Sequence, residues 1–317
     1  MNDTGQVSIA YKTKNQNENT MLNLKEFEVW FITGSQSLYG EDVLTEVASH
    51  AQTISQYFHQ ATGVPVNVIY KPVVKSGDEI YNMIQECNQA AKCIGIITWM
   101  HTFSPAKMWI RGLKILQKPL LHLHTQFNRE IPWATIDMDF MNLNQSAHGD
   151  REFGFIGSKM RLNRKVVVGH WQSEDVIQEV AAWTRVAAGK ADLNGAKFAR
   201  FGDNMREVAV TDGNKVSAEE QFGFSVNTYA VGDLVKVIHE VSEASVDDLV
   251  EVYQDSYDLD AVLLKKGARH ASLRDAAKIE LGLLQFLESG NFKGFTNTFE
   301  DLYGMKQLPG IATQRLM

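Results

Sequence analysis

The sequence predicts an α/β protein built from two consecutive domains, each with an open and mainly parallel sheet. From Phe27 onward, short apolar runs alternate with longer stretches of helical periodicity, which is the pattern of βαβ units. The run 93–97 is apolar on both faces, as a strand of a covered parallel sheet must be. The 317 residues suffice for two domains of ordinary size. The fold class is therefore Rossmann-like, with a second domain that we expect to be incomplete at its carboxyl end.

The elements follow from these patterns in chain order. The first domain is predicted over 24–195 and the second over 196–317, with a short linker between them. Strands are predicted at 28–33, 66–70, 94–99, 120–124, 165–168 and 197–201. Helices are predicted at 42–62, 78–91, 105–116, 174–188, 233–241, 246–257 and 273–287. A further helix begins at Ile311 and stops at Met317 without a cap, which favours an incomplete second domain.

Composition limits the kind of partner. Hydrophobic residues make up 44% and charged residues 22%, as in a soluble globular protein. A net charge of −7 argues against nucleic acid or an anionic membrane as the main partner. No uncharged apolar run reaches the roughly 18 residues of a membrane span. Two cysteines cannot form a disulfide framework, so we expect a reducing, cytoplasmic location.

The first 23 residues differ from the rest. Asn, Thr, Lys and Gln dominate between Asn2 and Thr20, and no continuous apolar core of a signal peptide is present. We expect residues 1–23 to be a disordered extension, with Met21 as a candidate translation start.

The segment Gly34–Gly40 is the first candidate ligand site. It directly follows a predicted strand, and ligands bind at the carboxyl ends of strands in such sheets. Its glycines stand only at its ends, unlike those of a phosphate loop. Between them Gln36, Leu38 and Tyr39 offer an amide, an apolar wall and a phenol. These groups suit a small polyhydroxylated molecule.

Two further segments end predicted strands. The segment 101–105 can line a cleft, Ser104 can cap the helix that begins near Pro105, and both roles can hold together. His122 and His124 point to the same side of their strand and could ligate zinc, although no third ligand is evident. The alternative is a pair of strand-end histidines bonded to the backbone or to neighbouring loops.

Polar residues also gather at 137–139 and 144–152. Their amide, imidazole and guanidinium groups suit hydrogen bonds to sugar hydroxyls, whereas the alternative is a solvated loop with an Arg151–Glu152 pair. Asp203, Arg206 and Glu207 could likewise serve as acid–base groups or form the capped and paired start of a helix.

Three classes of function are compatible with a cleft of this kind. The first is an enzyme acting on a small polar substrate. The second is a non-catalytic two-lobed sugar-binding module like the periplasmic binding proteins, which the missing export signal disfavours. The third is a nucleotide-binding regulatory domain, which lacks its phosphate loop here because no Gly-x-Gly-x-x-Gly follows a strand.

Long segments of the chain resemble the L-arabinose isomerase family. The resemblance runs in order from about residue 24 to the last residue. It is carried by 31–40, 98–109, 124–128, 136–157, 200–213, 222–233 and 295–317.

The resemblance implies conversion of L-arabinose to L-ribulose, with Mn²⁺ as a Lewis acid and carboxylates moving a proton through an enediol. It implies homotrimers or hexamers whose sites are completed across subunit interfaces. It also implies a sugar-binding role for residues of several segments: Gln36, Leu38, Tyr39, Phe103, Gln145, His148, Met205 and Phe299. Gln145 and His148 match groups that are offered to a neighbouring subunit.

The family's metal ligands, two Glu and two His, match no position of this sequence. We therefore expect no Mn²⁺ site and no catalytic residue in this chain, and no isomerisation by the chain alone. The alternatives are a non-catalytic sugar-binding remnant and one half of a split isomerase.

Overall fold

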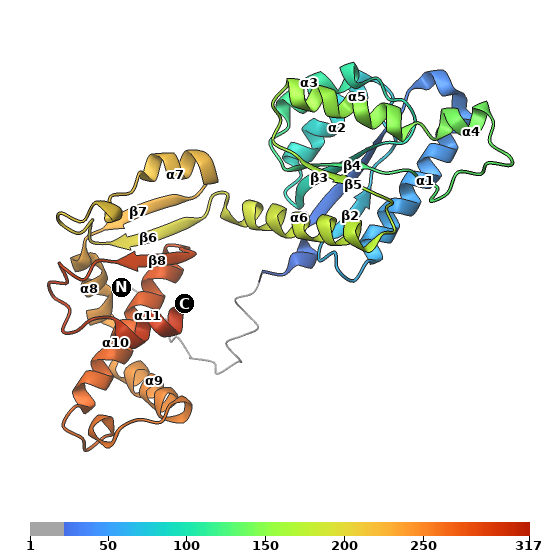
Figure 1. Cartoon of the computed structure of the whole chain (residues 1–317). Coiled ribbons are helices and arrows are strands. Elements are labelled where there is room, and N and C mark those ends of the chain that lie inside the picture. The colour runs from blue at the N-terminus through green and yellow to red at the C-terminus, as the bar shows by residue number, and fades with distance from the viewer. Residues whose placement is uncertain (1–21) are drawn as a thin grey trace, which may run out of the picture. The chain divides into compact units, whose positions relative to one another are not determined.

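A computed structural model describes residues 22–317, so the predicted extension lies almost entirely outside the described residues. The chain forms two compact units, residues 22–191 and residues 192–317, each of which is described by itself (Figure 1).

The first unit is built on a parallel sheet of five strands in the order β2-β1-β3-β4-β5. This is a doubly wound order, in which the chain reverses direction across the sheet between β1 and β3. The strands are β1 (Glu28–Gly34), β2 (Asn67–Tyr70), β3 (Cys93–Met100), β4 (Leu120–His124) and β5 (Lys165–Val168). All eight residues of β3 are buried, as expected of the central strand.

Helices cover both faces of this sheet. On one face Val29 and Phe31 pack with apolar residues of α1 (Gly40–Gln60) and α6 (Glu174–Leu193). On the other face Trp30 and Ile32 pack with α2 (Gly77–Gln89), α3 (Ile110–Ile115) and α5 (Ser146–Lys159). The remaining helices are α4 (Met138–Leu143) and the 3₁₀ turns Leu24–Glu26, Ser37–Tyr39 and Ala106–Trp109. The result is a three-layer sandwich whose loops and helix starts gather at the carboxyl ends of the strands.

The second unit has a parallel sheet of three strands in the order β7-β6-β8. The strands are β6 (Lys197–Phe201), β7 (Ser225–Tyr229) and β8 (Gly294–Asn297). Ala199 and Phe201 of β6 pack against apolar residues of three helices of this unit, α8, α10 and α11, whose bounds follow. The helices are α7 (Lys215–Phe222), α8 (Val231–Glu240), α9 (Glu243–Ser256), α10 (His270–Ser289) and α11 (Gly310–Leu316), with 3₁₀ turns at Ala209–Thr211 and Ala261–Leu263.

The predicted fold class is confirmed, because both sheets are open and parallel. The predicted bounds of β4, β5 and β6 agree with the structure residue for residue. Helices α4, α5 and α7 and strands β7 and β8 were not predicted, since their sequences are polar or short. The proposed boundary near residue 195 stays a prediction.

Candidate functional site

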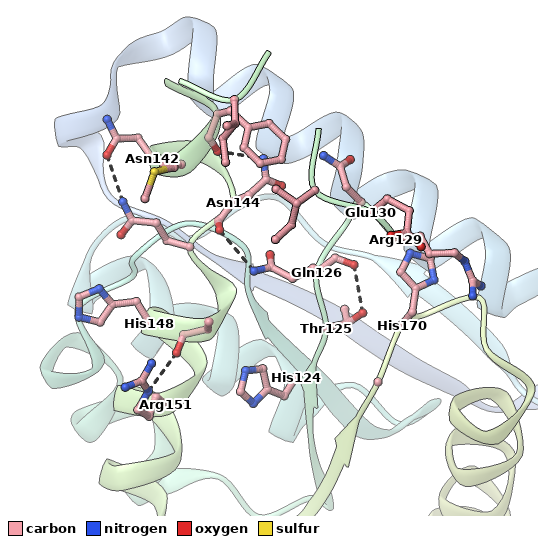
Figure 2. A pocket seen from close by; sticks show the side chains of 18 of the residues that line it. His124, Thr125, Gln126, Arg129, Glu130, Asn142, Asn144, His148, Arg151 and His170 are labelled. Carbon is pink, nitrogen blue, oxygen red and sulfur yellow. Dashed lines mark hydrogen bonds between the residues drawn. The ribbon is translucent and has the colours of Figure 1, made fainter. Parts of the chain in front are cut away.

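A cavity of about 900 Å³ lies in the first unit at the carboxyl ends of β4 and β5. It is bounded by the ends of these strands, by the segment 128–142 and by the start of α5 (Figure 2). This volume falls in the range of about 300–1,000 Å³ that is usual for small-molecule sites. The position is where ligands bind in doubly wound sheets.

Polar side chains of several kinds line this cavity, which we call the β4–β5 pocket. Amides come from Gln126, Asn128, Asn142, Asn144 and Gln145, imidazoles from His124, His148 and His170, guanidinium groups from Arg129 and Arg151, a carboxylate from Glu130 and a hydroxyl from Thr125. Apolar walls come from Ile136, Met138, Phe140 and Met141. Burial lowers the pKa of His124, so at neutral pH its imidazole is uncharged and offers one donor and one acceptor.

Internal hydrogen bonds hold parts of the pocket in place. Gln126 Nε2 donates to the carbonyl oxygen of Asn144 at 3.4 Å, and Gln145 Nε2 donates to Asn142 Oδ1 at 3.1 Å. Arg151 Nε donates to the carbonyl oxygen of Ala147, one turn earlier in α5. These bonds leave the pocket with several ring and amide groups that can still bind a hydroxylated ligand (Figure 2).

A buried pair joins α5 to the sheet directly below the pocket. His122 Nε2 of β4 lies 2.8 Å from Asp150 Oδ1 of α5, and the same oxygen accepts from the backbone N–H of Met100 at 3.2 Å. Both side chains are almost completely buried. Burial raises the pKa of Asp150 and lowers the pKa of His122 to about 3, so both shifts favour the uncharged forms.

A second, partly buried pair links α1 to the residue that follows β3. His50 Nδ1 lies 2.7 Å from His101 Nε2, and the ring of His50 stacks on Phe127 at 3.6 Å between centroids. The ring of His101 stacks on Trp99 at 4.4 Å. Burial lowers the pKa of His50 to about 4 and that of His101 to about 3, so the pair is neutral at neutral pH.

The predicted site residues of the first unit fall into two groups. Gln145 and His148 line the β4–β5 pocket, and the ring of Phe103 lies 5.2 Å from that of His148. Gln36, Leu38 and Tyr39 lie in the 3₁₀ turn and its flank after β1, and none of the three lines that pocket. Leu38 is 85% exposed, so it is available to a ligand or a partner.

The loops after β1 and β3 are joined beneath the surface. Ser35 Oγ and Thr102 Oγ1 lie 2.7 Å apart, and both residues are fully buried. The side chain of Ser104 is also buried and accepts from Trp109 Nε1 at 3.1 Å. The alternative in which Ser104 caps the next helix is therefore wrong, because the turn starts after Pro105 and has no side-chain cap.

Met205 and Phe299 lie together in the second unit. They line a smaller cavity of about 290 Å³ with Arg200, Asp203, Thr211 and the end of β8. The predicted roles of all these site residues stay predictions.

The polar segment 144–152 is not a solvated loop, because residues from Ser146 onward form α5. The suggested Arg151–Glu152 ion pair does not occur among the ion pairs of the described residues. Adjacent residues of a helix point in different directions. Glu152 instead accepts from the backbone N–H of Ala106 at 3.0 Å.

In the second unit, Arg206 pairs with Asp301 and Glu300 rather than with its neighbour Glu207.

The residues described here do not fit a divalent cation. His122 and His124 do face the same side of β4, with parallel rings 6.1 Å apart, but His122 Nε2 is bonded to Asp150. Between residues 22 and 317, no group of three or more His, Cys, Asp or Glu side chains could hold a metal ion.

Sequence reasoning missed His50, His170 and the apolar wall around Phe140. His170 follows β5 in the segment Gly169-His170, which is a strand-end signal of the same kind as those that were used. His50 gave no signal, because a histidine in an amphipathic helix resembles any half-buried polar residue.

Within the described part of the chain, no helix is both long and apolar enough to cross a lipid bilayer.

Comparison with known proteins gives a consistent result. Residues 23–195 match the model of the L-arabinose isomerase N-terminal domain, and residues 197–317 match that of the L-arabinose isomerase central domain. The chain is 63% identical over 297 residues to the L-arabinose isomerase of Herpetosiphon aurantiacus and 61% identical to that of Koribacter versatilis. These alignments cover 94% of this chain and 59% of each relative, so the chain spans about 59% of the length of these relatives. Because the two domain models together account for nearly all of the described residues, the chain belongs to the L-arabinose isomerase family.

Proposed function

We propose that this chain binds L-arabinose and acts in its isomerisation to L-ribulose by holding the sugar, while the described residues do not perform the proton transfer by themselves. The observation that carries this proposal is the β4–β5 pocket, in a chain whose two units match this family. Amide, imidazole and guanidinium groups meet there beside an apolar wall.

The chemistry of the pocket suits a sugar. Hydroxyl groups both donate and accept, so they pair well with amides and with neutral imidazoles such as that of His124. The apolar wall around Phe140 and Met141 suits the C–H faces of a sugar ring. Phe103, beside His148, extends this apolar surface.

Metal-assisted chemistry is not assigned to these residues, since they do not fit a cation site. Mn²⁺, the cofactor that the family resemblance implies, would polarise the sugar's oxygens when bound. The part that we assign to this chain is binding and orientation: Gln145 and His148 hold hydroxyl groups, and Phe103 limits the position of the ring.

We also propose that the β4–β5 pocket faces a second copy of the chain, as in the family's trimers and hexamers. Large apolar side chains are exposed on the segment beside it: Ile131, Trp133, Met138 and Met141. Trp133 is 79% exposed, and exposed apolar side chains that gather in one segment are typical of a contact surface. Light scattering of the purified chain should show a trimer or a larger closed assembly, and a monomer at all concentrations would contradict this part of the proposal.

Sugar binding is tested by titration calorimetry of the chain with L-arabinose. Gln145→Ala and His148→Ala should each weaken binding about 5- to 30-fold, the effect of roughly 1–2 kcal/mol from one lost hydrogen bond. Lys159→Ala is the matched control, because Lys159 is exposed in the last turn of the same helix and away from the pocket. Equal binding by all three variants would refute the role of the pocket.

Turnover is tested separately. The chain is incubated with L-arabinose and Mn²⁺, and ketose formation is measured. We expect binding without turnover. Ketose formed at the rate of an ordinary isomerase would refute the second half of the proposal and leave the first half intact.

A further inference from the structure

The only two cysteines of the sequence lie side by side in the first unit. Cys87 is in the last turn of α2 and Cys93 is the first residue of β3, and their sulfur atoms are 3.6 Å apart. Both are free thiols, 0% and 2% exposed. They lie near the amino end of β3, whereas the β4–β5 pocket lies at the carboxyl ends of the strands.

The surroundings distinguish the two sulfurs. Cys93 Sγ also lies 3.4 Å from the carbonyl oxygen of Gly95. The hydrogen bond between the thiols lowers the pKa of Cys93 and raises that of Cys87, and the nearby ammonium of Lys118 favours the thiolate at both. The more readily ionised sulfur is therefore that of Cys93, and only thiolates are strongly nucleophilic.

We propose that Cys87 and Cys93 form an oxidative modification site, at which a hydroperoxide converts the two thiols into an intramolecular disulfide. With hydrogen peroxide, the Cys93 thiolate attacks one peroxide oxygen and the O–O bond breaks. The hydroxide that leaves takes up a proton to form water, and Cys93 becomes a sulfenic acid. The Cys87 sulfur then attacks the sulfenic sulfur, its proton leaves with the hydroxyl group, and a second water is released. Two thiols are oxidised and one peroxide is reduced to two waters.

The geometry favours this product over others. The two sulfurs are already in contact, so the sulfenic acid meets its resolving thiol before a second peroxide can reach it. Burial of both sulfurs disfavours disulfides between chains. Access is through the turn 90–92, in which Ala91 and Lys92 are exposed. Lys118 Nζ and the backbone N–H of Cys93 both donate to the carbonyl oxygen of Ala90 and hold this turn closed. We therefore expect the opening of the turn to limit the rate of oxidation.

The experiment uses the purified full chain, freed of reductant and treated with hydrogen peroxide. Remaining thiols are then alkylated under denaturing conditions, and the intact mass is measured. We expect a product that takes up no alkyl group, is lighter than the reduced chain by two hydrogen atoms, and recovers both thiols with dithiothreitol. A tryptic map should contain the peptides of Cys87 and Cys93 as one linked species.

Single substitutions separate the two steps. Cys87→Ser should stop at a sulfenic acid on Cys93 that dimedone traps, whereas Cys93→Ser should leave Cys87 unoxidised at the same peroxide dose. Cys87→Ala and Cys93→Ala serve as second variants in case serine impairs folding, which circular dichroism reports. Full alkylation of the treated wild-type chain, disulfides only between chains, or sulfinic acid without a disulfide would each overturn the proposal.

Discussion

Replacing Asp150 with alanine should destabilise residues 22–191 and loosen the pocket above it. The carboxyl oxygen Oδ1 is the partner of both His122 Nε2 and the backbone N–H of Met100. Both of these groups are buried, and alanine would leave them without a partner. Each orphaned polar group costs about 1–3 kcal/mol, so the free energy of unfolding should fall by about 2–6 kcal/mol.

Asp150→Asn is the discriminating control. The pKa shifts of the pair favour uncharged forms, so a neutral amide should replace the carboxyl group at small cost. Its oxygen can accept from the same two donors. Its nitrogen takes the place of Oδ2, which has no hydrogen-bond partner among the described residues. We expect Asp150→Asn to lower the free energy of unfolding by less than half as much as Asp150→Ala.

The assay can isolate the first unit, because all six tryptophans of the sequence lie between residues 30 and 183. Urea unfolding followed by tryptophan fluorescence therefore reports on residues 22–191 alone. An asparagine variant as unstable as the alanine variant would show that the pair is ionised and refute the argument from burial. An alanine variant of unchanged stability would refute the structural role of the pair.

Three other predictions concern the same unit. His50 should contribute about 2 kcal/mol to a loss of stability as the pH drops from 6.5 towards 4, because its pKa is lowered to about 4 in the folded state and the unfolded chain takes up the proton first; the figure allows for the partial exposure of the ring. The pKa values of His101 and His122 are also lowered and add to this loss, so His50→Gln should make the fluorescence-monitored profile less steep without making it flat. Gly34→Ala should cost about 1–3 kcal/mol in urea unfolding, since the new Cβ would lie 2.6 Å from Ser104 Oγ; a cost below about 0.5 kcal/mol would show that the loops adjust freely. Trp133→Ser should shift the light-scattering mass towards the monomer without changing the urea midpoint, because the indole is exposed.

The sequence was most informative where strands stand between clear turn signals. The strands β4, β5 and β6 were predicted to the residue, because each is a short apolar run between clear breakers. Strands β7 and β8 were missed, since Ser225–Tyr229 and Gly294–Asn297 contain at least as many polar as apolar residues. Their pairing with β6 is decided by tertiary contacts rather than by local preference.

The candidate site was predictable only in part, for a related reason. Strand-end loops can be located from sequence, and Gln145 and His148 do meet in a pocket at such an edge. No pattern in the sequence indicates that α5 begins at Ser146, because the first turn of this helix is mainly polar and contains a glycine. Tertiary contacts stabilise this helix: Phe153 packs in the core, and Asp150 bonds to β3 and β4.

The buried polar side chains of residues 22–191 lie beside the candidate site, where they lower the stability of the unit but hold the site in place. Most fully buried polar side chains of residues 22–191 cluster where β1, β3 and β4 end and where α5 begins: Thr33, Ser35, Thr98, His101, Thr102, Ser104, His122, Thr125, Ser146 and Asp150. Burying such groups costs free energy unless they are hydrogen-bonded, so an ordinary core would avoid them. Here they fix the loops and the helix that present the pocket. Substitutions in this buried layer, such as Asp150→Ala, should therefore weaken sugar binding and stability together, whereas substitutions of Gln145 or His148 should weaken binding alone. If Asp150→Ala lost stability but bound L-arabinose as tightly as the unaltered chain, the buried layer would serve the fold and not the site.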